Sequence, residues 1–180
     1  MSTLRSNKIT DIAGTAAPNI PGAIIKVDSV TKTSEQSIAP DAKDEVSGLS
    51  ITVTPNSSSS KFLIMANLTY GADHDNQYAS GYMVRDNTDI GVGTTATGNQ
   101  LNVSFPMSLS NGAAENYKLR QASMTYLDSP STTSSITYKV KARNDDPAGN
   151  NFYINRPNAT DNNDYIHRGI STLTVMEIGG

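Results

Sequence analysis

The chain has 180 residues, a net charge of −3 at pH 7 and no cysteine, and only 17% of its residues are charged. This acidic balance provides no basic field for nucleic acid, and the absence of cysteine excludes a disulfide framework and a thiol nucleophile. No apolar run reaches the ~20 residues that span a bilayer, and no signal-peptide pattern follows the first residues. Serine, threonine and asparagine make up 57 residues, and these side chains favour turns over helices. We therefore expect a soluble β protein that inserts into no membrane and is not exported by the general secretory route.

Residues 1–22 do not have the composition of a folded domain. Their large apolar residues are few and widely spaced, and Pro18 and Pro21 favour extended backbone. Such a segment cannot bury enough surface to fold alone, but its apolar residues could dock into a groove of another chain. We expect an extended docking arm over 1–22 and one domain over 23–180. A frayed terminus is the alternative.

Short runs of alternating apolar residues then predict a series of strands separated by turns. The run 61–70 is apolar on much of both faces, which predicts a central position in a sheet. Asp86-Asn87-Thr88-Asp89 predicts a hairpin turn, because Asp and Asn tolerate turn conformations. The expected strands are 24–33, 49–54, 61–70, 82–85, 90–92, 101–109, 118–127, 136–143, 152–155 and 170–178.

The clearest alternation lies in 136–143, where Ile and Val residues alternate with Lys139, Lys141 and Arg143. This pattern is typical of a half-solvated strand with its charged face outward. The one candidate helix is 113–120. Short strands at roughly ten-residue spacing, with scarcely any helical periodicity, predict an all-β antiparallel sandwich of the jelly-roll type.

Few residues are suited to catalysis. His74 and His167 are far apart in sequence, and no Gly-x-Ser-x-Gly elbow is present. Spacing does not exclude paired carboxylates for glycoside cleavage, but the acidic residues fall mostly in polar turns. The glycines at 91–98 lack the Lys-Ser/Thr and the helix of a phosphate-binding loop. We therefore expect no enzyme activity, no catalytic residue and no cofactor.

Three acidic loops, 73–76, 144–146 and 161–164, offer oxygen ligands of the kind that calcium prefers. Asp73 and Asp75 are close enough in sequence to share an ion, but no loop has the glycine and glutamate spacing of the twelve-residue calcium loop. Solvated turns explain these loops better, and no metal ligand is expected. The histidines could also meet on a symmetry axis around a metal, although isolated histidines are more often plain surface residues.

Tyrosine side chains are the best candidates for contact with sugar rings. Tyr78 and Tyr165 fall in expected loops, and Asn162 and Asn163 precede Tyr165. These four residues are the candidate receptor-contact residues. The tyrosines on expected strands are interpreted as packing residues, namely Tyr70, Tyr82, Tyr126 and Tyr138.

The opening stretch Leu4–Asp11, followed by Gly14 and Pro18–Gly22, resembles the N-terminal segment of virion proteins from tailed phages, especially marine and cyanobacterial ones. Strand and turn patterns farther along resemble the same group and extend the resemblance over nearly the whole chain. They lie at 60–65, 81–85, 90–93, 126–134, 138–140, 153–156 and 171–178. These motifs are moderately specific and include no catalytic residue.

The resemblance implies a trimeric tail fibre or fibre-like protein, with an arm fixed to another virion structural protein and a jelly-roll-like knob that contacts carbohydrate on the host surface. The protein would be assembled in the host cytoplasm and located in the virion, on the tail rather than the head. Long fibres have a shaft between arm and knob, for which this chain has no room. The alternatives are a capsid decoration protein and, in another class, a carbohydrate-active enzyme domain. The residues expected to anchor the arm are Leu4, Asn7, Ile9, Ile12, Pro18, Ile20 and Pro21.

Overall fold

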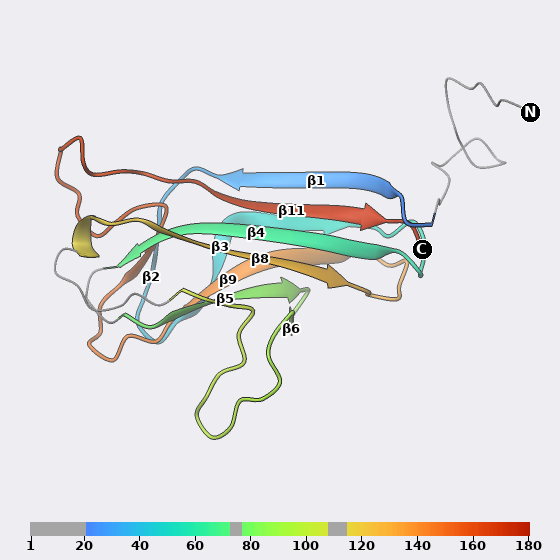
Figure 1. Cartoon of the computed structure of the whole chain (residues 1–180), viewed down its shortest axis with the longest axis horizontal. Helices are drawn as coiled ribbons and strands as arrows, with labels where there is room; N and C mark the ends of the chain where they lie inside the picture. The colour runs from blue at the N-terminus through green and yellow to red at the C-terminus, as the bar shows by residue number, and fades with distance from the viewer. Residues whose placement is uncertain (1–20, 73–76, 108–114) are drawn as a thin grey trace, which may run out of the picture.

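The computed structural model describes residues 21–72, 77–107 and 115–180 (Figure 1). In these residues the chain forms two antiparallel β-sheets. Sheet A contains β1 (Ile24–Lys32), β2 (Gln36–Ile38), β4 (Lys61–Ala72), β8 (Arg120–Asp128), β10 (Phe152–Ile154) and β11 (Ser171–Ile178). Sheet B contains β3 (Lys43–Val53), β5 (Ala79–Arg85), β6 (Thr88–Ile90), β7 (Phe105–Pro106) and β9 (Ile136–Asn144).

The strand order identifies the sandwich as a jelly roll. Sheet A has the order β1-β11-β4-β8, and the short β2 and β10 continue the rows of β1 and β11 along the same edge of β4. Sheet B has the order β3-β9-β5, with β6 and β7 sharing the far edge of β5. The strands can be numbered as eight rows in chain order: β1 with β2 is row 1, β3 is 2, β4 is 3, β5 is 4, β6 with β7 is 5, β8 is 6, β9 is 7, and β10 with β11 is 8. Sheet A then has the row order 1-8-3-6 and sheet B has 2-7-4-5. This is the order of the eight-stranded jelly roll with its two Greek keys. The predicted all-β jelly-roll sandwich is therefore confirmed.

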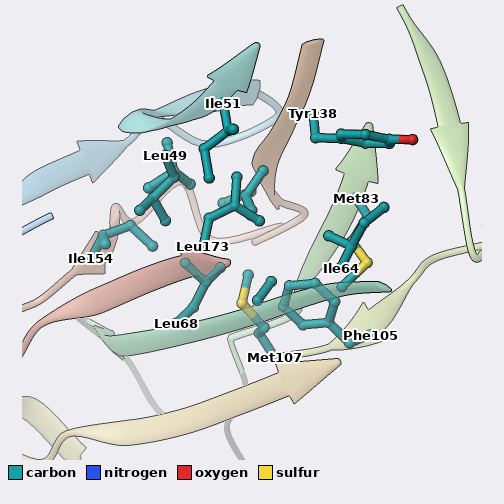
Figure 2. Packing of buried hydrophobic residues seen from close by; sticks show 14 of the residues in the cluster. Leu49, Ile51, Ile64, Leu68, Met83, Phe105, Met107, Tyr138, Ile154 and Leu173 are labelled. Atoms are coloured by element: carbon teal, nitrogen blue, oxygen red, sulfur yellow. The ribbon is translucent and has the colours of Figure 1, made fainter. Parts of the chain in front are cut away.

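The core between the sheets follows from period-two alternation along the strands. In β4, Phe62, Ile64 and Leu68 are buried, and in β9 the same holds for Tyr138 and Val140. Figure 2 shows side chains from both sheets meeting in this layer. The central position predicted for 61–70 is confirmed, because β4 has β11 on one edge and β8 on the other.

Two sequence predictions are wrong over most of their length in the described residues, and the strand expected over 90–92 lies two residues earlier, at Thr88–Ile90. The helix expected over 113–120 is reduced to a 3-10 turn, η1 (Glu115–Tyr117), and Arg120 already begins β8. The strand expected over 101–109 is reduced to β7, because the chain from 101 to 104 runs as a loop. In both places pairing with distant strands decides the structure, and local propensity does not. The described ranges also hold no helix long and apolar enough for a membrane span.

Two strand segments were not predicted from the sequence. These are β2 and the first half of β3, whose residues are mostly polar. Their backbone groups are satisfied by pairing with β10 and β9 respectively. Long-range pairing therefore creates strands where the side-chain pattern gives little indication of one.

The sandwich has two different ends (Figure 1). At one end, here called the terminal end, the backbone N–H of Gly22 donates to the carbonyl of Gly179 at 2.7 Å, and Gly179 donates to Ala23 at 2.9 Å. The opposite end, here called the loop end, carries η1 and the connection 155–170 between β10 and β11. The chain therefore enters the domain beside its last strand, and its longest described connection lies at the far end.

Candidate functional site

The outer face of sheet B is charged. Along β9, Lys139, Lys141 and Arg143 point outward, as predicted, while the residues between them are buried. Neighbouring strands supply acidic partners for these basic residues. Lys139 Nζ lies 3.4 Å from Glu45 Oε2, and on the same face Lys43 Nζ lies 2.6 Å from Asp89 Oδ2. A face of this kind is well suited to contact with water.

The outer face of sheet A has the opposite character. Directly paired residues share a face, so the register places Val27, Met176, Leu63 and Leu127 in one row across all four strands. Val27 is 53% exposed and Leu127 is 46% exposed. Together with their neighbours they form a surface that we call the apolar band, which consists of Ile24, Val27, Leu63, Met65, Leu127, Met176 and Ile178.

The apolar band lies toward the terminal end, because Ile24 begins β1 and Ile178 ends β11. Among the described residues that the register places on this face, Lys61 is the charged residue, and the others are apolar or neutral polar. Contiguous exposed apolar surface of this kind marks interaction sites in soluble proteins. The band is therefore a candidate contact surface.

At the loop end, Asn155 fixes both ends of the connection 155–170. It is 1% exposed and has a φ of 65°. Its backbone N–H donates to Thr69 at 2.8 Å, and its Nδ2 donates to the carbonyl of Lys32 at 2.9 Å. Its Oδ1 accepts from Ser171 Oγ at 2.7 Å, and its carbonyl accepts from the N–H of Gly169 at 2.9 Å. The connection is thereby attached to β1, β4 and β11.

Two further contacts hold the connection in place. A Cβ on Gly71 would lie 2.5 Å from the carbonyl oxygen of Arg156 and 2.7 Å from Cα of Pro157, so only glycine allows this close approach to β4. The N–H of Ala159 donates to the carbonyl of Asn116 at 2.8 Å, which joins the connection to η1. The connection and η1 therefore form one surface.

That surface carries an aromatic pair. The rings of Tyr117 and Tyr165 meet edge to face, with centroids 5.8 Å apart and planes at 70°. Tyr117 is 41% exposed and Tyr165 is 54% exposed, so both rings are accessible to solvent. They line a cavity of about 600 Å³ with Lys118, Arg120 and His167.

A second cavity of about 580 Å³ shares Leu119 and Arg120 with the first and is also lined by Gln121, Arg168 and Ile170. We call the two cavities together the tyrosine cleft. The described residues that line it include lysine, arginine and histidine but no carboxylate. Basic side chains therefore line the cleft, in a chain whose net charge is negative.

The four predicted receptor-contact residues do not form one site. Asn162, Asn163 and Tyr165 are exposed on the connection 155–170. Tyr78 lies instead in a different cavity of about 410 Å³, beside Arg143. The structure pairs Tyr165 with Tyr117, which sequence reasoning missed because nothing local relates positions 48 residues apart.

The remaining sequence predictions fall at the terminal end or outside the described residues. Pro21 is exposed and leads into β1, whereas the other arm residues lie outside the described ranges, namely Leu4, Asn7, Ile9, Ile12, Pro18 and Ile20. The acidic loop at 73–76, with His74, also lies outside them. The role of these residues stays a prediction.

The acidic loop after β9 has a structural role. Asp146 is buried, and its carboxylate accepts hydrogen bonds from the N–H groups of Ala148 at 3.1 Å and Asn150 at 2.9 Å. Asp145 Oδ1 lies 2.5 Å from Arg143 Nε. In the described part of the chain, no cluster of three or more histidine or acidic residues could hold a metal ion.

One buried ionic cluster joins the two sheets. Asp128, the last residue of β8, accepts two hydrogen bonds from Arg85 Nη1 at 2.9 and 2.8 Å and one from the Tyr138 hydroxyl at 2.7 Å. Burial, and then the Asp128 carboxylate, raise the pKa of Tyr138 above its ordinary value near 10. The Asp128 carboxylate thus has partners on both oxygens, and the geometry is that of a structural bridge.

No family model matches the sequence, and no curated protein is detectably similar to it. Among solved structures, a mutant VP2 protein of infectious bursal disease virus in T=1 particles aligns over 98% of this chain and 40% of its own, with 10% identity and a TM-score of 0.45. The VP2 subviral particle of the same virus aligns over 86% and 38%, with 7% identity and a TM-score of 0.46. The chain thus spans about two fifths of the length of these VP2 chains. Similarity at this level does not assign the chain to a family.

Proposed function

We propose that this protein is a structural component of a phage virion, a short tail fibre that acts by assembly and display and not by catalysis. The observation that carries the proposal is the separation of two surfaces on one domain. The apolar band lies toward the terminal end, whereas the exposed tyrosines lie at the loop end. A domain that is mounted at one end and makes contact at the other needs this polarity. The resemblance to tailed-phage virion proteins supplies the setting.

Self-association in a homotrimer accounts for the apolar band. Exposed apolar surface gains roughly 25 cal/mol per Å² when it is removed from water, and closed symmetric oligomers bury the same patch on every copy. The outer face of sheet B is unsuited to this role, because charges such as Lys141 and Glu45 would have to be desolvated there. We therefore assign the contact between copies to sheet A.

Attachment of the domain to the particle through residues 1–22 agrees with the place where the chain enters the domain. Pro21 and Gly22 lie at the terminal end, next to the band. In a trimer that packs through the band, the arms of the copies would leave close together and could bind one partner site on another virion protein. Contact with host carbohydrate is then left to the loop end. Several weak sites on one assembly would supply affinity through avidity.

The test follows the protein on the particle. Antibody-labelled protein is imaged on intact virions by electron microscopy, and the purified chain is examined by native mass spectrometry. Label on the tail and a trimeric mass are the expected results. Uniform label on the head would instead favour a capsid decoration protein, and release of new reducing ends from host polysaccharide would favour an enzyme. A chain lacking residues 1–20 should remain trimeric but no longer join the particle, and a monomeric product would contradict the proposal.

A further inference from the structure

We infer that a cavity on the outer face of sheet B binds a neutral hexopyranose unit of a carbohydrate. The inference rests on the proposed function, since it names the class of sugar that the loop end would contact. The cavity, here called the Tyr78 cavity, has a volume of about 410 Å³, which falls within the range typical of small-molecule sites. The lining residues that bear on the ligand are Tyr78, Ser80, Asn99, Leu101, Arg143 and Asp145.

The Tyr78 cavity lies on a face that the proposed trimer leaves exposed. Ser80 in β5 pairs directly with Arg143 in β9, so both side chains lie on the outward face of sheet B. β5 begins at the loop end (Figure 1), and the antiparallel β9 ends there. Because the contact between copies is assigned to sheet A, every copy would present this cavity to a host surface.

The charged groups of the cavity suit a ligand that both donates and accepts hydrogen bonds. Arg143 Nε lies 2.5 Å from Asp145 Oδ1, so the two charges compensate one another. Within the described residues, neither Asp145 Oδ2 nor the terminal nitrogens of Arg143 form a further hydrogen bond. A sugar hydroxyl can donate to a carboxylate oxygen and accept from a guanidinium N–H. Two neighbouring hydroxyls would therefore satisfy both residues.

The same pair selects against an anionic sugar. Asp145 Oδ2 needs a donor, whereas the ionised carboxylate of a uronate only accepts. That carboxylate would also bring a second negative charge into a cavity whose cation, Arg143, is already paired with Asp145. The geometry therefore favours a neutral sugar over a uronate.

The apolar side chains of the cavity suit the C–H face of a pyranose ring. Tyr78 is 55% exposed and Leu101 is 48% exposed, and both line the cavity. A tyrosine ring combines an apolar face with a hydroxyl group, as a pyranose does. Ser80 is 6% exposed, and its hydroxyl has no hydrogen-bond partner among the described residues. Buried hydroxyls normally have a partner, which a water or a ligand in the cavity would supply.

The walls of the cavity are fixed before any ligand binds. The backbone N–H of Asp145 donates to the carbonyl of Tyr78 at 2.8 Å. Ser104 Oγ donates to the carbonyl of Ile90 at 2.8 Å, which joins the two ends of the loop 91–104. Preorganised walls lower the entropy cost of ligand binding.

An extended peptide fits the site less well. Such peptides commonly bind by adding a strand to an open sheet edge. In sheet B, β5 has β9 on one edge and β6 and β7 on the other. The backbone beside the cavity is therefore already paired.

The experiment uses the full chain and pairs of probes. The methyl glycosides of glucose, galactose and mannose are each compared with the methyl uronoside of the same configuration, in which a carboxylate replaces the hydroxymethyl group. NMR titration measures the dissociation constants. At least one hexoside should bind, and at least about tenfold more tightly than its uronoside. This comparison needs no variant, so it tests the inference even where a variant fails to fold.

Two variants test the residues of the site. Asp145→Asn should weaken hexoside binding about tenfold, because a charge-assisted hydrogen bond is lost. It should also narrow the difference between hexoside and uronoside, which a purely structural effect would not do. Tyr78→Ala should weaken hexoside binding severalfold through loss of the ring face.

Two further variants serve as controls. Asp89→Asn removes a carboxylate from the same face of sheet B, where Asp89 Oδ2 lies 2.6 Å from Lys43 Nζ. Tyr165→Ala removes an exposed tyrosine from the tyrosine cleft. Both should bind the hexoside like the natural chain, and thermal unfolding should show that every variant is folded.

Four outcomes would overturn the inference. They are binding of none of the three hexosides, equal binding of hexoside and uronoside, tighter binding of a capped polar tetrapeptide than of any hexoside, and loss of hexoside binding in Tyr165→Ala but not in Tyr78→Ala. The last outcome would place the sugar in the tyrosine cleft.

Failure of the inference and failure of the proposed function are distinguishable. A trimer that mounts on the tail but binds none of the hexosides would leave the structural function in place and remove the sugar ligand. A monomer that is absent from the particle but prefers a hexoside to its uronoside would do the reverse.

Discussion

Ser171 Oγ donates a 2.7 Å hydrogen bond to Oδ1 of Asn155, and this buried contact closes the ring of bonds that holds the connection 155–170. The two residues are 16 positions apart, and Ser171 Oγ also accepts from the backbone N–H of Thr69 at 3.0 Å. The tyrosine cleft at one end of the jelly roll thus depends on a polar cluster within the sandwich itself.

Replacing Asn155 should destabilise the protein more than any exposed substitution in the same connection. Asn155→Ala removes three side-chain hydrogen bonds, leaves buried carbonyls unpaired and places a Cβ residue without a polar group at a φ of 65°. We expect a loss of about 2–4 kcal/mol in the free energy of unfolding, measured by urea denaturation. Asn155→Gly keeps the backbone freedom and loses only the side-chain bonds, so its loss should be smaller. Equal losses would show that the left-handed backbone contributes nothing.

Stability should fall at alkaline pH because of Tyr138. Its raised pKa means that the folded protein keeps a proton that the unfolded chain releases near pH 10. The contribution of Tyr138 to the free energy of unfolding is therefore complete below pH 10. Above pH 10 it falls by up to about 1.4 kcal/mol per pH unit for one proton. Tyr70, with its pKa also raised by burial, adds in the same direction. Burial lowers the pKa of Lys32, so the folded protein releases this proton at a lower pH than the unfolded chain does. The free energy of unfolding therefore rises with pH through this group, and the rise is complete near pH 10.5.

Urea denaturation between pH 8 and 11.5 measures this slope, and Tyr138→Phe should make it shallower. At pH 7 the same substitution should cost about 1–2 kcal/mol, because Asp128 loses one hydrogen-bond donor. Tyr78→Phe, at an exposed position, is the control. If the Tyr138→Phe variant kept the full alkaline slope, another group would be responsible for it.

Gly81→Ala should be poorly tolerated. A Cβ at this position would lie 2.2 Å from Cε2 of the Phe105 ring, which packs directly on the β5 backbone. Overpacking of this kind costs roughly 1–3 kcal/mol or more. The double variant Gly81→Ala with Phe105→Leu should recover part of the loss, as seen in a double-mutant cycle of thermal unfolding. Gly93→Ala is the control, because its Cβ would meet nothing closer than 3.5 Å.

If copies of the chain associate through the apolar band as proposed, Leu127→Asp should separate them without unfolding the domain. Leu127 is 46% exposed, so the isolated domain loses little, but a carboxylate in the apolar band cannot be desolvated between subunits. We expect a monomeric mass by light scattering and an unchanged circular dichroism spectrum. Thr52→Asp, an exposed position on the outer face of sheet B, should leave the oligomer intact. Dissociation by both variants would argue against the apolar band as the contact.

Local alternation in the sequence determined most of the strands. The inward set of β4 and the charged outward set of β9 follow from period two along a single segment, and Asp86-Asn87 marks the hairpin between β5 and β6. The apolar residues on both faces of β4 also indicated its central position in the sheet. These features depend only on residues a few positions apart, which the sequence lists directly.

The tertiary structure alone decided which strands lie side by side and therefore which surfaces exist. The row from Val27 to Leu127 needs three strand registers, and the pairing of Tyr117 with Tyr165 needs the chain to return to η1 after three more strands. The expected helix over 113–120 failed for the same reason, since β8 gains its hydrogen bonds from β4. Register is set by burial and backbone pairing between segments distant in sequence, and no local pattern encodes that choice.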